Sequence, residues 1–128
     1  MGAIAPSSKY LTKKMMGNLS LSEANVVVEF GPGTGVFTKK LLELIGPKSK
    51  LIVIEINKAF YDNLKQRFND PRLTLINGSA TDLSLYLKQL KLYEADVIIS
   101  SLPLAVLPSL LRNRIVLSAS DSLSKSGK

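Results

Sequence analysis

Four short runs of β-branched and aliphatic residues divide the sequence at nearly regular intervals. They lie at residues 26–30, 51–55, 73–77 and 96–101. Almost every position within them is apolar, which is typical of strands that other elements cover on both faces. The pattern therefore predicts four parallel strands.

Between and after these runs, apolar residues recur at intervals of three and four, as they do on one face of a helix. One such segment follows each run, and the last begins after Pro108. Gly46 and Pro47 end the first of these helices, and Pro71 follows the second. Alternating strands and helices predict an α/β fold, with helices on both faces of a doubly wound parallel sheet.

Residues 7–19 predict one more helix near the amino end, for which Ser7 or Ser8 is a suitable N-cap. The basic residues of this segment are Lys9, Lys13 and Lys14. They form either an ordinary solvated face or part of the surface that approaches a substrate or a membrane. We expect residues 1–128 to form a single domain, with residues 1–20 as its amino-terminal helix.

The composition narrows the chemistry that this domain can perform. Its 128 residues include no Cys and no His. This excludes an ordinary zinc site, a Ser-His or Cys-His nucleophile pair and an imidazole base. We therefore predict no metal site and single out no catalytic side chain.

The charge of the chain points to an anionic partner. The formal net charge is +7 at pH 7, which favours either nucleic acid or an acidic membrane surface. The apolar runs are shorter than the roughly 20 residues that span a bilayer, and the first residues match neither a signal peptide nor a myristoylation site. We therefore expect a cytoplasmic protein that is at most peripheral to the inner face of the membrane.

A glycine-rich loop directly follows the first predicted strand, in the sequence Glu29-Phe-Gly-Pro-Gly-Thr-Gly35. Glycines let the backbone pass close to a ligand because no Cβ intervenes. The helix that opens at about Val36 offers its free N–H groups. Glu55 stands at the tip of the next strand, where a carboxylate can accept hydrogen bonds from two ribose hydroxyls. Strand, loop, helix, strand and acid in this order predict a nucleoside-cofactor site.

The spacing of the glycines separates two classes of cofactor. A dinucleotide site uses the pattern G-x-G-x-x-G, whereas this loop reads G-x-G-x-G, with Val36 and Phe37 where the third glycine of a dinucleotide site would stand. Glu29 before the loop suits a ligand that bears a cationic amine, such as S-adenosylmethionine. Alternatively, Glu29 only braces the loop or the amino-terminal helix through hydrogen bonds.

These motifs together resemble those of a class I S-adenosylmethionine-dependent methyltransferase, from about Pro6 to the last residue. The resemblance implies that the glycine loop packs against the methionine part of the cofactor, that Glu55 holds the ribose and that Ile56 packs on adenine. Ser79 departs from the family because an Asp usually contacts adenine there; either its hydroxyl makes a weaker contact or Asp82 replaces it. The cofactor-binding residues implied in this way are Glu29, Gly31, Gly33, Thr34, Gly35, Glu55, Ile56, Ser79, Ala80 and Ser100.

The segment after the fourth run bears on the substrate. Adenine amino methyltransferases, including the ribosomal RNA dimethylases, resemble this region but carry Asn or Asp, then Pro, then an aromatic ring that stacks on a flipped base. Here the amide is replaced by Ser101 and the ring by Leu104. The apolar rim that results suits a lipid chain, or else is plain core. Similarity to the bacterial phospholipid N-methyltransferases, which methylate phosphatidylethanolamine, implies that Ser101, Leu102 and Pro103 contact the substrate.

Methylation of a lipid amine is therefore the favoured function, with a nucleic-acid partner less favoured. The alternatives are adenine N-methylation in ribosomal RNA and a non-catalytic fragment or degenerate member that only binds the nucleoside. A lipid ammonium must lose a proton before it can accept a methyl group. Glu29, Tyr10 or a residue not placed by the sequence would accept that proton.

The resemblance also implies a sheet of seven strands in the order 3-2-1-4-5-7-6, of which the pattern supplies only four. We therefore expect a Rossmann-like sheet truncated after strand four and its following helix, in the order 3-2-1-4. The run at residues 96–101 would then be an unpaired edge rich in β-branched residues, which predicts a dimer through that edge.

Overall fold

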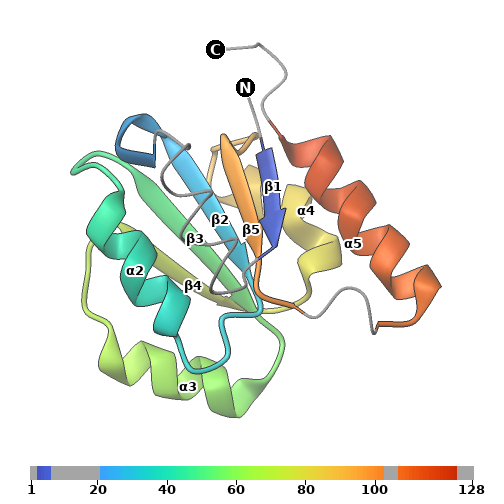
Figure 1. Cartoon of the computed structure of the whole chain (residues 1–128), viewed down its shortest axis with the longest axis horizontal. Coiled ribbons are helices and arrows are strands. Elements are labelled where there is room, and N and C mark those ends of the chain that lie inside the picture. The colour runs from blue at the N-terminus through green and yellow to red at the C-terminus, as the bar shows by residue number, and fades with distance from the viewer. Residues whose placement is uncertain (1–2, 7–20, 103–106, 124–128) are drawn as a thin grey trace.

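The computed structural model describes residues 3–6, 21–102 and 107–123, which form a parallel β-sheet between two layers of helices (Figure 1). Its strands are β1 (Ala3–Pro6), β2 (Val26–Phe30), β3 (Lys50–Glu55), β4 (Leu73–Asn77) and β5 (Val97–Ser100). Its α-helices are α2 (Val36–Leu44), α3 (Lys58–Arg67), α4 (Leu83–Gln89) and α5 (Ser109–Ser122). Two short 3-10 helices are η1 (Leu21–Glu23) and η2 (Ala80–Asp82). The four predicted strands and the helices that follow them are confirmed.

The strands lie in the order β1-β5-β2-β3-β4, and each neighbouring pair is parallel. The first, second, third and fourth predicted strands correspond to β2, β3, β4 and β5. The sheet therefore has these four strands in the predicted order 3-2-1-4. At the centre, Val28 of β2 lies between Ile52 of β3 and Ile98 of β5. All five residues of β2 are buried, which explains why every position except Glu29 is apolar.

The strand β1 corrects one prediction. It pairs with β5 on the side away from β2, so that Ile4 lies beside Ile98 and β5 is an interior strand. The prediction of an unpaired edge at residues 96–101 is therefore wrong, and the argument for a dimer through that edge falls with it. The sequence did not predict β1 because four residues are too few to show a strand pattern. Its last residue, Pro6, is compatible with the position of β1 at the edge of the sheet, where Pro is tolerated. The helix predicted at residues 7–19 lies outside the described residues.

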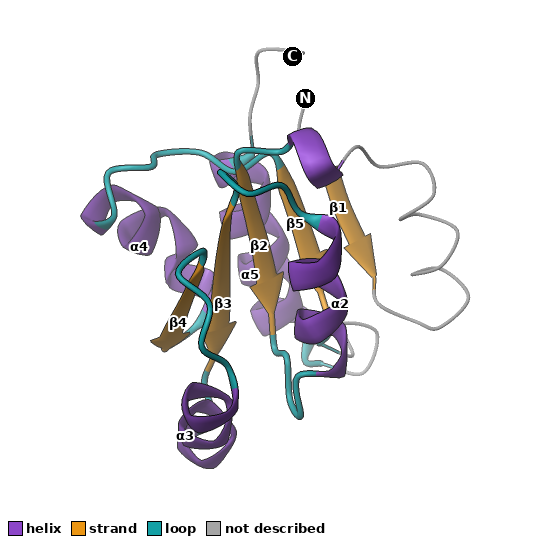
Figure 2. Ribbon diagram, turned by 90° about the vertical axis from the view of Figure 1, so that its left-hand side faces the viewer, coloured by secondary structure: helices purple, strands orange, loops and turns teal. Residues whose placement is uncertain are grey.

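Helices lie on both faces of the sheet (Figure 2). An apolar core on each face holds them in place. On one face, Leu87 of α4 and Ile115 of α5 belong to the same buried cluster as Val28. On the other face, Leu41 of α2 is clustered with Val27. Adjacent residues of a strand enter different cores because successive side chains point to opposite faces. None of the helices in the described part of the chain is both long and apolar enough to cross a membrane.

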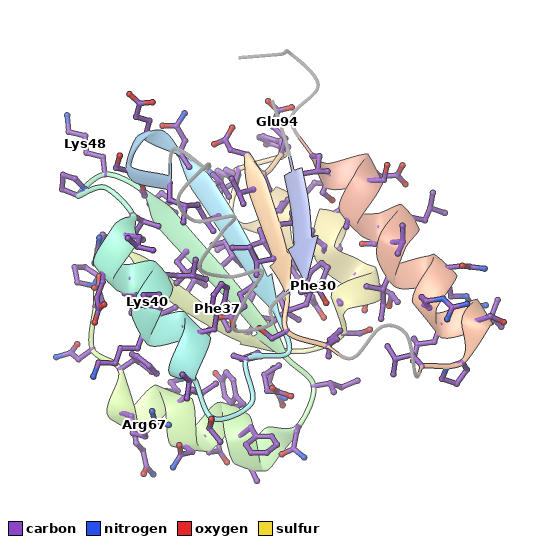
Figure 3. The ribbon with its side chains drawn as sticks, in the orientation of Figure 1. Phe30, Phe37, Lys40, Lys48, Arg67 and Glu94 are labelled. Atoms are coloured by element: carbon purple, nitrogen blue, oxygen red, sulfur yellow. The ribbon has the colours of Figure 1, made fainter. Side chains whose placement is uncertain are left out.

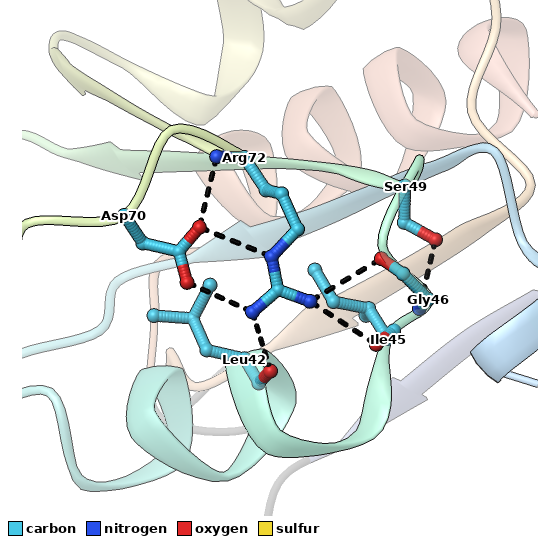
Figure 4. A network of polar contacts seen from close by, with 6 residues as sticks. All are labelled: Leu42, Ile45, Gly46, Ser49, Asp70 and Arg72. Atoms are coloured by element: carbon cyan, nitrogen blue, oxygen red, sulfur yellow. Dashed lines mark hydrogen bonds and ion pairs between the residues drawn. The ribbon is translucent and has the colours of Figure 1, made fainter.

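Arg72, just before β4, fixes the end of α2 to the sheet (Figure 4). Its guanidinium donates hydrogen bonds to the carbonyl oxygen of Leu42 in the last turn of α2 (2.8 Å), which has no intrahelical partner, and to those of Ile45 (3.1 Å) and Gly46 (3.2 Å), which follow the helix. It also pairs with Asp70, with 2.8 Å between Nη2 and Oδ2. The hydrogen bonds that the Arg72 side chain donates lower the pKa of Asp70, and the positive charge of Arg72 adds to this effect. This set of contacts holds α2, which connects β2 to β3, against the sheet.

Candidate functional site

The carboxyl ends of the strands meet at one edge of the sheet, which points towards α3 in Figure 1. The loops after β2, β3, β4 and β5 leave from this edge, and they carry the residues predicted for the site. Ligands of open α/β sheets bind outside this edge, where successive loops diverge. The fold therefore brings together four motifs that lie far apart in the sequence.

The glycine loop after β2 requires glycine for its backbone conformation. Gly31, Gly33 and Gly35 have φ angles of 64°, 58° and 86°, in the left-handed region that side chains with a Cβ disfavour. Among the described residues, a Cβ added to Gly33 would have no atom within 4 Å apart from its chain neighbours, so this residue faces open space. A Cβ on Gly35 would lie 2.5 Å from Cδ2 of Leu64 in α3. Gly33 thus leaves room for a ligand, whereas Gly35 is needed for packing.

The helix α3 also holds the loop through Arg67, which Figure 3 labels on this helix. The Nη1 atom of Arg67 donates hydrogen bonds to the carbonyl oxygen of Thr34 and to Oδ1 of Asn63. Thr34 therefore contributes its backbone to the architecture of the loop, while its side chain is exposed. Sequence reasoning missed Arg67, because nothing in a lone arginine on a helix shows that it reaches a loop 33 residues earlier.

Glu55 links the end of β3 to the glycine loop. Its Oε1 atom accepts a hydrogen bond from the backbone N–H of Gly33 at 3.0 Å, and its Oε2 atom accepts one from Asn57 at 2.9 Å. Glu55 is only 6% exposed, and each of its carboxylate oxygens has a second lone-pair site that a ribose hydroxyl could occupy. The next residue, Ile56, is 71% exposed and offers an apolar surface to a planar base. This placement fits the predicted roles, which remain predictions.

The loop after β4 uses Ser79 to begin η2. The hydroxyl of Ser79 accepts a hydrogen bond from the backbone N–H of Thr81 at 3.2 Å and shares another with the Thr81 hydroxyl at 2.8 Å. The backbone N–H of Ser79 donates to the hydroxyl of Tyr86 in α4 at 3.1 Å. Ala80 is buried in the core, and Asp82 is exposed. Ser79 is therefore a helix cap, and Tyr86 is a supporting residue that the sequence did not reveal.

Glu29 is completely buried beneath the glycine loop. Its Oε1 atom accepts a hydrogen bond from the hydroxyl of Thr38 at 2.6 Å, and its Oε2 atom accepts one from the hydroxyl of Ser101 at 3.0 Å. The pKa of Glu29 is raised from 4.5 to about 7, mainly because burial disfavours the charged form; the hydrogen bonds from Thr38 and Ser101 oppose this shift, and the negative charge of Glu55 adds to it. Both protonation states of Glu29 are therefore populated near neutral pH.

This position favours the bracing alternative for Glu29 over direct contact with a cofactor amine, because its carboxylate bonds to two protein hydroxyls. Thr38 was missed as its partner. The signal was available, since Thr38 stands three residues before Leu41 and shares the buried side of α2. A hydroxyl on a buried helix face needs a polar partner.

The end of β5 lies directly beside the glycine loop. Ser101 donates its backbone N–H to the carbonyl oxygen of Phe30 at 2.8 Å. Ser100 is buried, and its hydroxyl accepts a hydrogen bond from the backbone N–H of Leu102 at 3.3 Å. The side chain of Leu102 lies so close over Gly31 that a Cβ there would collide with it. Pro103 and Leu104 lie outside the described residues.

These features fit an S-adenosylmethionine site. Gly33 faces open space, Glu55 retains acceptor capacity, and Ile56 is exposed next to it. No cluster of metal-ligating residues occurs in the part of the chain that the structure describes. The fold and the site together define a Rossmann-like domain of the class I methyltransferase type.

Comparison with known proteins identifies the family. A family model described as ribosomal RNA adenine dimethylase matches residues 7–117. The ornithine lipid N-methyltransferase of Singulisphaera acidiphila is 32% identical over 128 residues, which cover 99% of this chain and 67% of that protein. The ribosomal RNA small subunit methyltransferase A of a Hydrogenobaculum species is 33% identical over 108 residues, which cover 84% of this chain and 39% of that protein. The chain belongs to the ribosomal RNA adenine dimethylase family of S-adenosylmethionine-dependent methyltransferases.

Solved structures agree with this assignment of the fold. A putative rRNA methylase from Clostridium thermocellum superposes with a TM-score of 0.72 at 16% identity, over 91% of this chain and 64% of that one. The O-methyltransferase TomG from Streptomyces achromogenes, solved in complex with SAM, superposes with a TM-score of 0.68 at 17% identity, over 92% of this chain and 52% of that one. The chain therefore spans between about two fifths and two thirds of the length of these four proteins.

Proposed function

We propose that the protein binds S-adenosylmethionine at the carboxyl edge of the sheet and transfers its methyl group to the amine of a lipid headgroup. The observation that carries the lipid proposal is the pair of residues at the end of β5. Ser101 places a hydroxyl there, hydrogen-bonded to Glu29, and Leu102 places an apolar side chain over the glycine loop. The adenine amino methyltransferases that this region resembles carry Asn or Asp and an aromatic ring to hold a flipped base, where this chain has Ser101 and Leu104.

The relatives support the same proposal. The similarity to an ornithine lipid N-methyltransferase extends over 99% of the chain. The net charge of +7 suits approach to an anionic membrane surface. An ornithine headgroup and an ethanolamine headgroup share one reactive group, an aliphatic amine that is an ammonium at neutral pH. We therefore name the acceptor as an aliphatic lipid amine.

Bound S-adenosylmethionine supplies an electrophilic methyl group on a sulfonium centre. The residues of this chain have the tasks of binding and alignment, which account for most of the catalysis in such a transfer. Glu55 accepts hydrogen bonds from the ribose hydroxyls, and Ile56 covers the adenine ring. Gly33 lets the backbone lie against the ligand. Ser101 holds the acceptor amine at the end of β5.

Adenine methylation in ribosomal RNA is the second candidate, because the matching family model carries that description and several curated relatives are ribosomal RNA methyltransferases. The two candidates differ in the acceptor alone. Both require the same cofactor site, so cofactor binding does not distinguish them.

Two measurements test the proposal. Calorimetry with S-adenosylmethionine, S-adenosylhomocysteine and NADH should show binding of the first two and weaker or no binding of NADH. Transfer of radiolabelled methyl groups is then compared on vesicles with phosphatidylethanolamine, vesicles with ornithine lipid, and ribosomal RNA. We expect label in at least one lipid and none in RNA.

The variant Gly33→Val should abolish transfer because its side chain fills the ligand space. The control variant is Lys48→Ala, in an exposed turn before β3, which should leave transfer unchanged. Label in RNA alone would refute the lipid proposal. Tighter binding of NADH would refute the cofactor assignment itself.

A further inference from the structure

The contact between Ser101 and Glu29 joins a partly buried hydroxyl to a completely buried carboxylate. Glu29 is completely buried, so its carboxylate cannot meet a substrate directly. Ser101 is only partly buried, and its hydroxyl donates to Oε2 of Glu29 at 3.0 Å. The hydroxyl of Ser101 thus stands between the proposed acceptor position at the end of β5 and a carboxylate in the interior.

We propose that Ser101 and Glu29 form a proton relay that converts the ammonium of the acceptor lipid into the neutral amine. This inference rests on the proposed function, because only an aliphatic amine arrives with a proton that must leave. An ammonium has no lone pair with which to attack a methyl group. The amine of adenine carries no such proton at neutral pH, so an RNA methyltransferase has no need of the relay.

The ammonium gives a proton to the oxygen of Ser101 while the hydroxyl of Ser101 gives its own proton to the carboxylate of Glu29. The neutral amine then attacks, so that its N–C bond forms as the S–C bond breaks and the electron pair of that bond stays on sulfur. The methylated nitrogen is again cationic, and the carboxyl group of Glu29 returns its proton to water.

The surroundings of Glu29 suit a group that gains and loses a proton near neutral pH. Among the described residues, three others act on it: Thr38 from α2, Ser101 after β5 and Glu55 at the end of β3. Glu55 is the charged one of these three, and its negative charge favours the protonated form of Glu29. Thr38 holds the other carboxylate oxygen at 2.6 Å, which fixes the carboxyl group with Oε2 towards Ser101. Glu29 is a positioning residue in this scheme because it acts through Ser101.

The test compares the relay variants Glu29→Gln and Ser101→Ala with the wild-type protein. The matched control for Glu29→Gln is Glu43→Gln on the exposed side of α2, and the control for Ser101→Ala is Ser118→Ala on the buried side of α5. Glutamine keeps the size and hydrogen-bonding groups of Glu29 but cannot take up the proton. We expect each relay variant to lower kcat for lipid methylation at pH 7 by about 100-fold, the scale of general-base catalysis. Binding of S-adenosylmethionine should change less than about threefold in Glu29→Gln.

The pH profile separates a relay from a merely structural role. In Glu29→Gln the rate should rise about tenfold for each pH unit up to the pKa of the amine, because the neutral amine must then come from solution. The wild-type rate should level off above a pH of about 7, where Glu29 is ionised. Ser101→Thr, which keeps the hydroxyl, should restore most of the wild-type rate.

A second readout needs no substrate. Infrared titration of the protonated carboxyl of Glu29, assigned by its loss in Glu29→Gln, should give a midpoint near 7 in the wild type. The midpoint should rise in Ser101→Ala, because the hydroxyl stabilises the charged form. A midpoint at the ordinary value of 4.5 would overturn the relay whatever the substrate.

Failure of the relay and failure of the proposed function give different results. If lipid is labelled and Glu29→Gln keeps the wild-type rate and pH profile, the relay is wrong and the lipid proposal stands. If only RNA is labelled, the lipid proposal is wrong, and the relay falls with it because no acceptor proton has to be removed.

Discussion

The backbone N–H of Gly33 donates a hydrogen bond to Oε1 of Glu55 at 3.0 Å, and this contact joins the glycine loop to the end of the neighbouring strand. The two residues stand 22 positions apart in the sequence. Glu55 therefore has a structural task in addition to the predicted hydrogen bonds to ribose. The loop and the acid form one structural unit rather than two separate motifs.

Replacing Glu55 by Ala should weaken binding of S-adenosylmethionine by about 1.5–3 kcal/mol, the usual value of hydrogen bonds to a charged group. Glu55→Gln keeps one oxygen acceptor and should lose less. Calorimetry on both variants measures the change, and circular dichroism checks that the sheet is retained. Unchanged affinity together with a lower melting temperature would show that Glu55 only supports the loop.

Gly33 and Gly35 should respond differently to the same substitution. The new Cβ of Gly33→Ala meets no atom in the described part of the chain beyond its neighbours in sequence. We therefore expect a loss of about 1–2 kcal/mol in unfolding free energy from the left-handed backbone, together with loss of cofactor binding. Gly35→Ala places its Cβ 2.5 Å from Leu64 and should destabilise the fold more strongly. Urea unfolding and calorimetry on the two variants make the comparison. Intact binding in Gly33→Ala would place the ligand elsewhere.

The raised pKa of Glu29 predicts a pH-dependent stability. The folded state holds this proton more tightly than the unfolded state, so the unfolding free energy falls as the pH rises from 4.5 to about 7 and stays lower above that range. The difference corresponds to about 3 kcal/mol. Glu29→Gln should remove this contribution, while the exposed control Glu43→Gln should keep it. Urea unfolding between pH 5 and pH 8 tests this, and parallel curves for wild type and Glu29→Gln would contradict the assignment.

Arg72 should matter for stability and not for the cofactor. Arg72→Ala leaves the last carbonyl oxygens of α2 without their donor and should lower the unfolding free energy by about 2 kcal/mol. Arg72→Lys should recover only part of this, because one ammonium cannot replace a planar guanidinium that contacts three carbonyl groups. Lys65→Ala on exposed α3 serves as the control. Thermal unfolding measures stability, and calorimetry should show unchanged cofactor affinity in every variant.

Local patterns were sufficient to predict much of this protein. Continuous apolar runs such as residues 26–30 identify strands buried on both faces, and their alternation with helical spacing determines a parallel sheet. The loop between Glu29 and Gly35 and the acid at Glu55 were recognisable because their chemistry depends on short-range spacing. The family assignment followed from these motifs and is confirmed.

Tertiary structure decided the contacts between residues far apart in the chain. The strand β1 has only four residues, so its place beside β5 depends on backbone pairing across 94 positions. Arg67 and Tyr86 gain their roles from helices that pack onto loops, and no local pattern marks such contacts. The pairing of Glu29 with Ser101 spans 72 positions. Burial and pKa depend on every element that excludes water from a group, and only the assembled fold determines which elements those are.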